Sequence, residues 1–255
     1  MYKNKRIIAL IPARKGSKRI KSKNIYPVNG YPLVAYTLVA SSMVKSIDKI
    51  YVSTDSNEIG EICKKYHTLV EIIKRPKAYA TDSAGDNEWL AHALKKVEKD
   101  IGKDYYILHL RPTSPLRTNI LIQDWIEIFY NLETKKLATS LRTIHEMKET
   151  PYKGFHLKNN YLKPLFKREK EYFNKPVQSL PKCYKTNGAV DILLPSLVKK
   201  GIQHGKKIYG HITEYISDID TLEDIEYVQN KLNKHMYWHY EYLREFFYEN
   251  TVRNI

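Results

Sequence analysis

Four short apolar runs in the first half of the chain have the length and composition of buried strands: residues 7–11, 49–52, 69–73 and 105–110. Segments with apolar residues at helical spacing lie between and after them: residues 33–44, 57–66, 87–97 and a stretch from Thr118 to about residue 129. Thr118 is a suitable N-cap for the last of these helices. Strands that alternate with helices predict a doubly wound α/β fold with a mostly parallel sheet.

Polar residues stand shortly after the end of each of these apolar runs. They are Arg14, Asp55, Arg75 and Arg111. In doubly wound sheets, ligands bind at the carboxyl ends of the strands. We therefore expect these four side chains to lie at a functional site along that edge of the sheet.

The second half of the chain has a weaker pattern. Residues from about 145 to 186 are rich in Lys, Tyr, Pro and Asn, which favours a small flap or dimerisation insertion within a single domain of residues 1–255. Regular structure resumes at residues 189–194. Thr221 can then cap a helix, since apolar residues continue at near-helical spacing toward the chain end. We expect one long C-terminal helix, with a helical extension over about residues 230–255.

The composition is that of a globular protein with a core. Of the 255 residues, 42% are hydrophobic and 28% are charged, which excludes a disordered or a fibrous chain. The longest apolar stretch, residues 33–44, is interrupted by Thr37 and by two serines. A membrane-spanning helix needs about 20 apolar residues, so we expect no membrane partner.

The cysteines and the first residues favour a cytoplasmic protein. Cys63 and Cys183 match no metal-binding or disulfide spacing, which is typical of reduced thiols. Basic residues followed by the apolar residues 7–13 imitate a signal peptide. Arg14 and Lys15 follow, however, where a small-residue cleavage site would stand.

The net charge is strongly positive: 43 Lys and Arg against 28 Asp and Glu give +15. A basic surface attracts nucleic acid, anionic lipid, or phosphorylated and carboxylated small molecules. Zinc spacings, KH-type GxxG loops and RNP aromatic patterns are all missing from the sequence. The charge by itself favours nucleic acid modestly, but no motif supports it, so we expect acidic small molecules, and not nucleic acid, as ligands.

The loop after the first strand, IPARKGSKR at residues 11–19, has suitable residues for phosphate binding. Gly16 allows backbone N–H groups to approach a phosphate closely. Arg14 and Lys18 add charge-assisted contacts to phosphate oxygens. The spacings of Walker loops and dinucleotide-binding loops are absent, so the loop taken alone is also consistent with a solvated basic turn.

Two further pairs of polar residues have both a functional and a structural interpretation. Lys23 could reach a phosphate and Asn24 could read a base edge, or the two could form a surface turn. Asp218 and Asp220 alternate in an extended segment, so both carboxylates can face one cation. Two carboxylates together with phosphate oxygens suit Mg²⁺, whereas the alternative is a helix N-terminus stabilised by negative charge.

Seven motifs occur in order along the chain: IPARKGSKR at 11–19, the pair Lys23-Asn24, STDS at 53–56, RP at 75–76, RPTSPLR at 111–117, NGAV at 187–190 and SDIDTLED at 217–224. Over roughly residues 6–230 the sequence resembles the acylneuraminate cytidylyltransferases, the CMP-sialic acid synthetase family, whose bacterial relatives also activate legionaminic and pseudaminic acids. The resemblance implies a Rossmann-like fold and usually a homodimer in which a flap completes the partner's site. It also implies Mg²⁺-dependent transfer of CMP from CTP to a 2-keto-3-deoxy sugar acid, with release of pyrophosphate.

The resemblance implies a role for each matching position. The residues implied to surround the nucleotide are Ala13, Arg14, Gly16, Ser17, Asn24, Arg75, Ala84 and Asp86. The residues implied to act on the phosphates during catalysis are Arg14, Lys18 and Lys23. The residues implied to contact the acceptor sugar are Arg111, Gln178, Tyr184, Asn187 and Gly188. Asp218 and Asp220 would bind Mg²⁺.

Several positions depart from the family pattern. Lys15 stands where a glycine is usual, and Asp86 replaces a small hydroxyl residue near the base. Arg111 stands in place of the glutamine of a QPTSPLR motif, a position that contacts the sugar. The family's Arg-Arg-Gln stretch reads Pro-Val-Gln at residues 176–178, and Asp191 replaces an aromatic residue. The nucleotide and metal residues therefore match the family better than the acceptor residues do.

The acceptor is consequently open between two chemistries. Arg111 could compensate for the arginine missing at Val177 and bind the carboxylate of a sialic-acid-like sugar. It could instead mark a nucleotidyltransferase of the same fold with a phosphorylated or phosphonate acceptor.

Two other groups of residues have simpler interpretations. His145 lies near Glu146 and Glu149, which could indicate acid–base chemistry but is typical of isolated surface polar residues. The aromatic residues of segment 237–248 predict a helix packed on the body of the protein or on a partner subunit.

Overall fold

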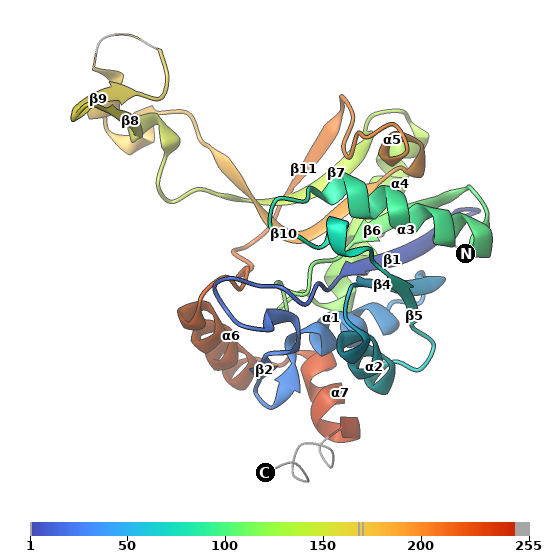
Figure 1. The fold of residues 1–255 in the computed structure, drawn as a ribbon. Helices are drawn as coiled ribbons and strands as arrows, with labels where there is room; N and C mark the ends of the chain where they lie inside the picture. The colour runs from blue at the N-terminus through green and yellow to red at the C-terminus, as the bar shows by residue number, and fades with distance from the viewer. Residues whose placement is uncertain (1, 168, 170, 248–255) are drawn as a thin grey trace.

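A seven-stranded sheet forms the centre of the computed structural model, which describes residues 2–167, 169 and 171–247 (Figure 1). Its strands are β1 (Arg6–Pro12), β4 (Lys49–Thr54), β5 (Glu71–Lys74), β6 (Tyr105–His109), β7 (Ser140–Glu146), β10 (Tyr184–Leu193) and β11 (Ile208–Ile212). Their order is β11-β7-β10-β6-β1-β4-β5. β10 runs antiparallel to both of its neighbours, and the other pairs of adjacent strands are parallel. The prediction of a doubly wound, mostly parallel sheet is confirmed.

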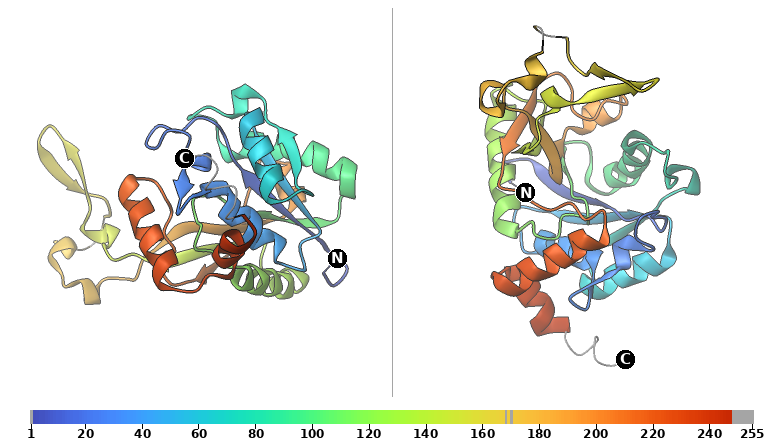
Figure 2. Two further views of the ribbon diagram at one scale, coloured as in Figure 1. Left: turned by 90° about the horizontal axis from the view of Figure 1, so that it is seen from below. Right: turned by 90° about the vertical axis from the view of Figure 1, so that its left-hand side faces the viewer.

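Helices cover both faces of this sheet (Figure 2). They are α1 (Leu33–Ser42), α2 (Asn57–Tyr66), α3 (Asp86–Ile101), α4 (Asn119–Thr134), α5 (Pro195–Val198), α6 (Leu222–Lys234) and α7 (Trp238–Phe247). Successive residues of β1 point to opposite faces: Ile7 packs with α1, α2 and α4, whereas Ile8 packs with α3 and α5. Because both faces are buried, the strand is apolar without alternation.

The C-terminal segment differs from the single long helix that the spacing predicts. α6 ends at Lys234, His235 is extended with φ −130° and ψ 147°, and α7 begins at Trp238. The turn brings Tyr240 of α7 against Tyr36 of α1, with ring centroids 6.1 Å apart. Apolar spacing continues through the turn because both helices pack on the same core, so spacing alone does not reveal the break. Residues 248–255 of the expected extension lie outside the described residues.

An arm, defined here as residues 147–183, projects from the body between β7 and β10 (Figures 1 and 2). It contains the antiparallel hairpin β8 (Phe155–Lys158) and β9 (Tyr161–Pro164) and the short helical turns η3 (Pro151–Lys153), η4 (Tyr172–Asn174) and η5 (Val177–Ser179). The remaining short elements are η1 (Lys23–Ile25), β2 (Pro27–Val28), β3 (Tyr31–Pro32) and η2 (Lys77–Tyr79).

Within the part of the chain that the structure describes, helices fall short of the length and apolar character needed to cross a membrane.

The start of α6 sets the direction in which the preceding aspartate segment leaves the sheet. The hydroxyl of Thr221 accepts a hydrogen bond from the backbone N–H of Asp224 at 3.3 Å, and the Asp224 carboxylate accepts one from the N–H of Thr221 at 2.8 Å. This reciprocal capping box satisfies two N–H groups that the helix itself leaves unpaired.

We expect Thr221→Ala to lower the free energy of unfolding by about 1 kcal/mol, because one helix N–H loses its partner. For a domain of this size, that corresponds to a fall in Tm of roughly 2 °C in a thermal melt. The matched control is Thr134→Ala, since the Thr134 hydroxyl bonds the Tyr130 carbonyl in the last turn of α4 and caps no helix. Equal melting temperatures for the two variants would contradict the assigned cap.

Candidate active site

A cleft with a volume of about 450 Å³ opens at the carboxyl ends of β1 and β6. It brings together eleven of the residues predicted from the sequence: Arg14, Gly16, Ser17, Lys18, Lys23, Asn24, Arg75, Ala84, Asp86, Arg111 and Asp220. Tyr79, Thr81, Asp82 and Trp89 also line it. These four were missed by the sequence analysis, because an ordinary polar loop and a helix carry them to the cleft.

The loop after β1 is fixed by hydrogen bonds to neighbouring backbone and side-chain groups. The buried Ala13 donates its N–H to the Ser53 carbonyl at 3.0 Å. The N–H of Lys15 donates to the Asp55 carboxylate at 2.8 Å, and the Asn24 amide donates to the Arg14 carbonyl at 2.8 Å. Asn24 therefore fixes the shape of the loop, and Ala13 supports the loop from beneath.

Four cationic side chains of this region share two carboxylates. Arg14 and Lys18 pair with Asp82 at 2.7 and 3.1 Å. Arg19 and Lys23 pair with Asp220 at 2.8 and 3.0 Å. Hydrogen bonds from Arg14 and Lys18 hold the pKa of Asp82 below its ordinary value. Because four positive charges face two negative ones, this part of the cleft has surplus positive charge for an anionic ligand.

Arg75 forms a rigid wall of the cleft. Its side chain is buried, donates to the carbonyl and hydroxyl of Ser53 at 2.9 and 3.0 Å, and lies 4.7 Å from the ring centre of Trp89. Burial lowers the pKa of Arg75 to about 10, so the guanidinium is still charged at neutral pH. The Trp89 indole N–H in turn donates to Asp86 at 2.8 Å.

The two aspartates before α6 lie beside the β6–α4 loop, since the N–H of Ile219 donates to the Thr113 carbonyl at 2.8 Å. Burial raises the pKa of Asp218, and the neighbouring carboxylate of Asp220 raises it further. Two carboxylates that repel each other are a donor set that a divalent cation stabilises. In the described part of the chain, His, Cys, Asp and Glu form no group of three or more that could hold a metal, so a cation here would need ligands from a substrate.

The NG pair of β10 lies next to these groups. Gly188 has φ +70°, and a Cβ at this position would lie 3.6 Å from the Asp218 carboxylate and 3.7 Å from the side chain of Arg111. These are ordinary van der Waals distances, so a side chain here would be strained by the positive φ and not by lack of space. Asn187 is buried and bonds the hydroxyls of Thr143 and Thr213 at 2.6 and 2.8 Å, so it braces the strand and does not face a ligand.

The other predicted acceptor residues are not brought to this cleft. Gln178 belongs to η5 of the arm, and Tyr184 is the first residue of β10 at the base of the arm.

His145, considered above for acid–base chemistry, packs edge-on against Tyr215 with ring centroids 5.3 Å apart. Burial lowers the pKa of His145, which is consistent with a neutral packing residue.

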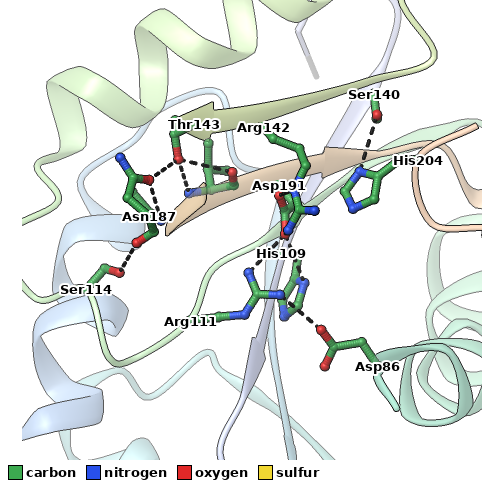
Figure 3. A network of polar contacts seen from close by, with 12 residues as sticks. Asp86, His109, Arg111, Ser114, Ser140, Arg142, Thr143, Asn187, Asp191 and His204 are labelled. Carbon is green, nitrogen blue, oxygen red and sulfur yellow. Dashed lines mark hydrogen bonds and ion pairs between the residues drawn. The ribbon is translucent and has the colours of Figure 1, made fainter. Parts of the chain in front are cut away.

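An ionic network lies at the back of the cleft (Figure 3). Arg111 donates to Asp191 at 2.9 Å and to Asp86 at 3.0 Å. Arg142 of β7 donates to the other oxygen of Asp191 at 2.7 Å. Burial raises the pKa of Asp191, but the charges of Arg111 and Arg142 and the hydrogen bond from Arg111 together outweigh it and hold the pKa below its ordinary value.

His109 lies beneath this network and is fully buried. Burial and the charge of Arg111 lower its pKa to about 3, so the imidazole is neutral. Its ring packs edge-on against Trp89, with centroids 5.1 Å apart, and neither ring nitrogen has a hydrogen-bond partner among the described residues.

Comparison with known proteins adds independent information. A family model described as cytidylyltransferase matches residues 8–251. The CMP-N,N'-diacetyllegionaminic acid synthase of Legionella pneumophila is 33% identical over 212 residues, covering 82% of this chain and 85% of that protein. The N-acylneuraminate cytidylyltransferase of Escherichia coli O18:K1:H7 is 30% identical over 137 residues, or 53% of this chain, and the match spans 31% of that longer protein.

Solved structures show the same fold. CMP:2-keto-3-deoxy-manno-octonic acid synthetase complexed with CTP has a TM-score of 0.65 at 12% sequence identity. The superposition covers 91% of this chain and 100% of that one.

The buried neutral His109 has a consequence for acid stability. The unfolded chain takes up a proton near pH 6.5, whereas the folded chain resists it until about pH 3, so the unfolded state is favoured as the pH falls below 6.5. Wild type should lose about 2 kcal/mol through this residue between roughly pH 7.5 and 5. We expect His109→Phe to remove that part of the pH dependence of urea unfolding. The exposed His156→Phe is the control, and the same acid sensitivity in all three proteins would contradict a depressed pKa.

Proposed function

The chain belongs to the cytidylyltransferase family and is a nucleotidyltransferase, and from this premise we propose that it transfers CMP from CTP to a nonulosonic acid. The acceptor class is a sialic-acid-like 2-keto-3-deoxy sugar acid, and pyrophosphate is the second product. The observation that carries the proposal is the cleft in which the surplus cations of the β1 loop adjoin Asp220, with Asp218 two residues before it in the chain. The names of the relatives support the acceptor class.

The surplus cations would bind the triphosphate. Arg14 and Lys18 extend from the loop after β1, and Lys23 approaches from η1. A triphosphate would replace Asp82 as the partner of Arg14 and Lys18, and Gly16 and Ser17 leave the loop backbone open to phosphate oxygens. The cytidine would lie toward Arg75 and Trp89, with Ala84 and Asp86 beside it.

Asp218 and Asp220 would hold a Mg²⁺ ion together with phosphate oxygens, since Mg²⁺ is commonly bound through one or two carboxylates and substrate phosphates. When bound, the ion would neutralise phosphate charge and polarise the α-phosphate. Lys23 lies 3.0 Å from Asp220 and also donates to the Ile219 carbonyl at 2.8 Å. It is thus fixed where charge develops on the phosphates.

The reaction needs no covalent intermediate. A hydroxyl oxygen of the sugar acid gives up its proton to water and bonds to the α-phosphorus while the bond from that phosphorus to the bridging oxygen of the β-phosphate breaks, and pyrophosphate leaves with the bonding electrons. Negative charge grows on the phosphate oxygens during this step. Arg14, Lys18 and Lys23 would accelerate it by electrostatic stabilisation and by positioning.

We further propose a cytoplasmic homodimer in which the arm completes the acceptor site of the partner. The arm projects away from the body of its own chain and carries Gln178, and Tyr184 stands at its base (Figure 1). Exposed apolar side chains of its hairpin, such as Leu157 and Leu162, would then be covered by the second subunit. The alternative function is a nucleotidyltransferase of the same fold that uses a phosphorylated or phosphonate acceptor.

The direct test is pyrophosphate release with CTP against a panel of nonulosonic acids, with the other three nucleotides as controls.

We expect Lys23→Met to lower kcat/KM for CTP by about 100-fold, because a fixed positive charge at the phosphates is lost. Lys21→Met is the matched control, since Lys21 is exposed in the same loop and does not line the cleft. Equal losses in both variants would contradict the role of Lys23.

Removing divalent cations with a chelator should abolish pyrophosphate release, and added Mg²⁺ should restore it. We expect Asp218→Asn to raise the Mg²⁺ concentration for half-maximal rate by about tenfold or more, because one of the two carboxylate ligands is lost. The control is Asp124→Asn, which neutralises an exposed aspartate of α4. An unchanged Mg²⁺ requirement in Asp218→Asn would exclude this aspartate as a ligand.

A further inference from the structure

Three positions at which the chain departs from the pattern of the family are in direct contact with one another. The guanidinium of Arg111 lies between Asp86 and Asp191 and donates a hydrogen bond to each, at 3.0 and 2.9 Å (Figure 3). In the sequence these residues are far apart, and each departure appears unrelated to the others. In the fold they form one structural unit.

This network is electrically balanced. Arg111 and Arg142 contribute two positive charges, and Asp86 and Asp191 contribute two negative charges. His109 adds none, because burial keeps it neutral. The carboxylates are well satisfied, since Asp86 also accepts from the Trp89 indole and Asp191 also accepts from Arg142.

The backbone of Arg111 is fixed as firmly as its side chain. Arg117 is buried and donates from both terminal nitrogens to the Arg111 carbonyl, at 3.2 and 3.3 Å. The same guanidinium bonds the Ala189 carbonyl of β10 and the Thr37 hydroxyl of α1. Arg111 therefore stands at a fixed place beside Gly188, where the acceptor half of the cleft begins.

Because Asp86 and Asp191 already balance the charge of Arg111, this arginine binds a further anion poorly. A second negative group on the acceptor would approach Arg111 while facing the carboxylates of Asp86 and Asp191, and like charges at such short range repel. An uncharged oxygen has no such penalty. Two of the five N–H groups of the guanidinium donate to the carboxylates, and the side chain is partly exposed in the cleft.

We propose that Arg111 determines acceptor specificity by donating hydrogen bonds to an uncharged oxygen of the acceptor, a hydroxyl or an acyl carbonyl. Asp86 and Asp191 are positioning residues that hold Arg111 and cancel its charge. The site thereby selects acids whose carboxylate is their sole anionic group and discriminates against phosphorylated or phosphonate acids. The inference rests on the proposed function, because it concerns the acceptor of that same reaction.

The experiment compares the preferred nonulosonic acid of the pyrophosphate assay with its derivative phosphorylated on a side-chain hydroxyl. Wild type should prefer the unphosphorylated acid by at least about tenfold in kcat/KM. Asp191→Asn and Asp86→Asn each uncover one positive charge at Arg111. In both variants the preference should shift toward the phosphorylated acid by about tenfold, through the KM for that acid. Asp191→Asn, which lies outside the residues proposed to surround the nucleotide, should change the KM for CTP by less than about twofold.

Asp100→Asn is the matched control, because Asp100 is an ion-paired aspartate at the other end of α3, joined to Lys96. It should leave the acceptor preference unchanged. Asp86 is partly exposed, so Asp86→Asn is expected to fold even if loss of the buried Asp191 carboxylate prevents folding of Asp191→Asn.

The outcomes separate the two claims. A wild-type preference for the phosphorylated acid would overturn the inference alone, as would an unchanged preference in a folded Asp86→Asn variant. No pyrophosphate release with any acid would overturn the proposed function, and the inference with it.

Discussion

Repulsion among the cationic side chains at the carboxyl ends of the strands is the constraint on which this site depends. Among the described residues, Arg14 and Lys18 share Asp82 as an ion-pair partner, and Arg19 and Lys23 share Asp220. Such crowding persists only where the backbone is fixed by other contacts. The sheet, buried on both faces, fixes the backbone here, together with a hydrogen bond from the Lys15 N–H to Asp55 and one from the Asn24 amide to the Arg14 carbonyl. In the proposed function, the negative charge of a triphosphate would relieve the repulsion among these cations and so strengthen its binding.

The two halves of the cleft are built on different electrostatic principles. The half formed by the segment after β1 has more cations than carboxylates. The half around Arg111 is neutral, because Asp86 and Asp191 balance the charges of Arg111 and Arg142. Under the proposed function, a strongly charged substrate would be attracted to one side of the cleft and recognised by shape and hydrogen bonds on the other. The total charge of +15 does not reveal this division, since it depends on which carboxylates the fold brings to which cations.

The sequence predicted most of what is local and little of what depends on pairing in space. The strand at residues 7–11 and the helix at 57–66 were recognisable from their own residues. The strand is a continuous apolar run, and the helix has apolar residues at helical spacing. Strand β7 was missed because Thr143 is buried and polar and Arg142 is ion-paired, which hides the apolar pattern. The loop after β1 was recognisable as part of the cleft because its residues are consecutive. Asp82, Trp89 and the contact of Arg111 with Asp191 were not, because distant elements assemble them.

The central claim is that this cleft joins CMP to a sugar acid. Its most direct test is to incubate the protein with Mg²⁺, all four nucleoside triphosphates at equal concentration and a panel of nonulosonic acids, and to identify the products by mass spectrometry. The account predicts a single class of product, the CMP-linked sugar acid, formed in step with pyrophosphate. A product that carries another nucleotide, or the absence of any nucleotide-linked acid in a reaction that consumes CTP, would contradict it.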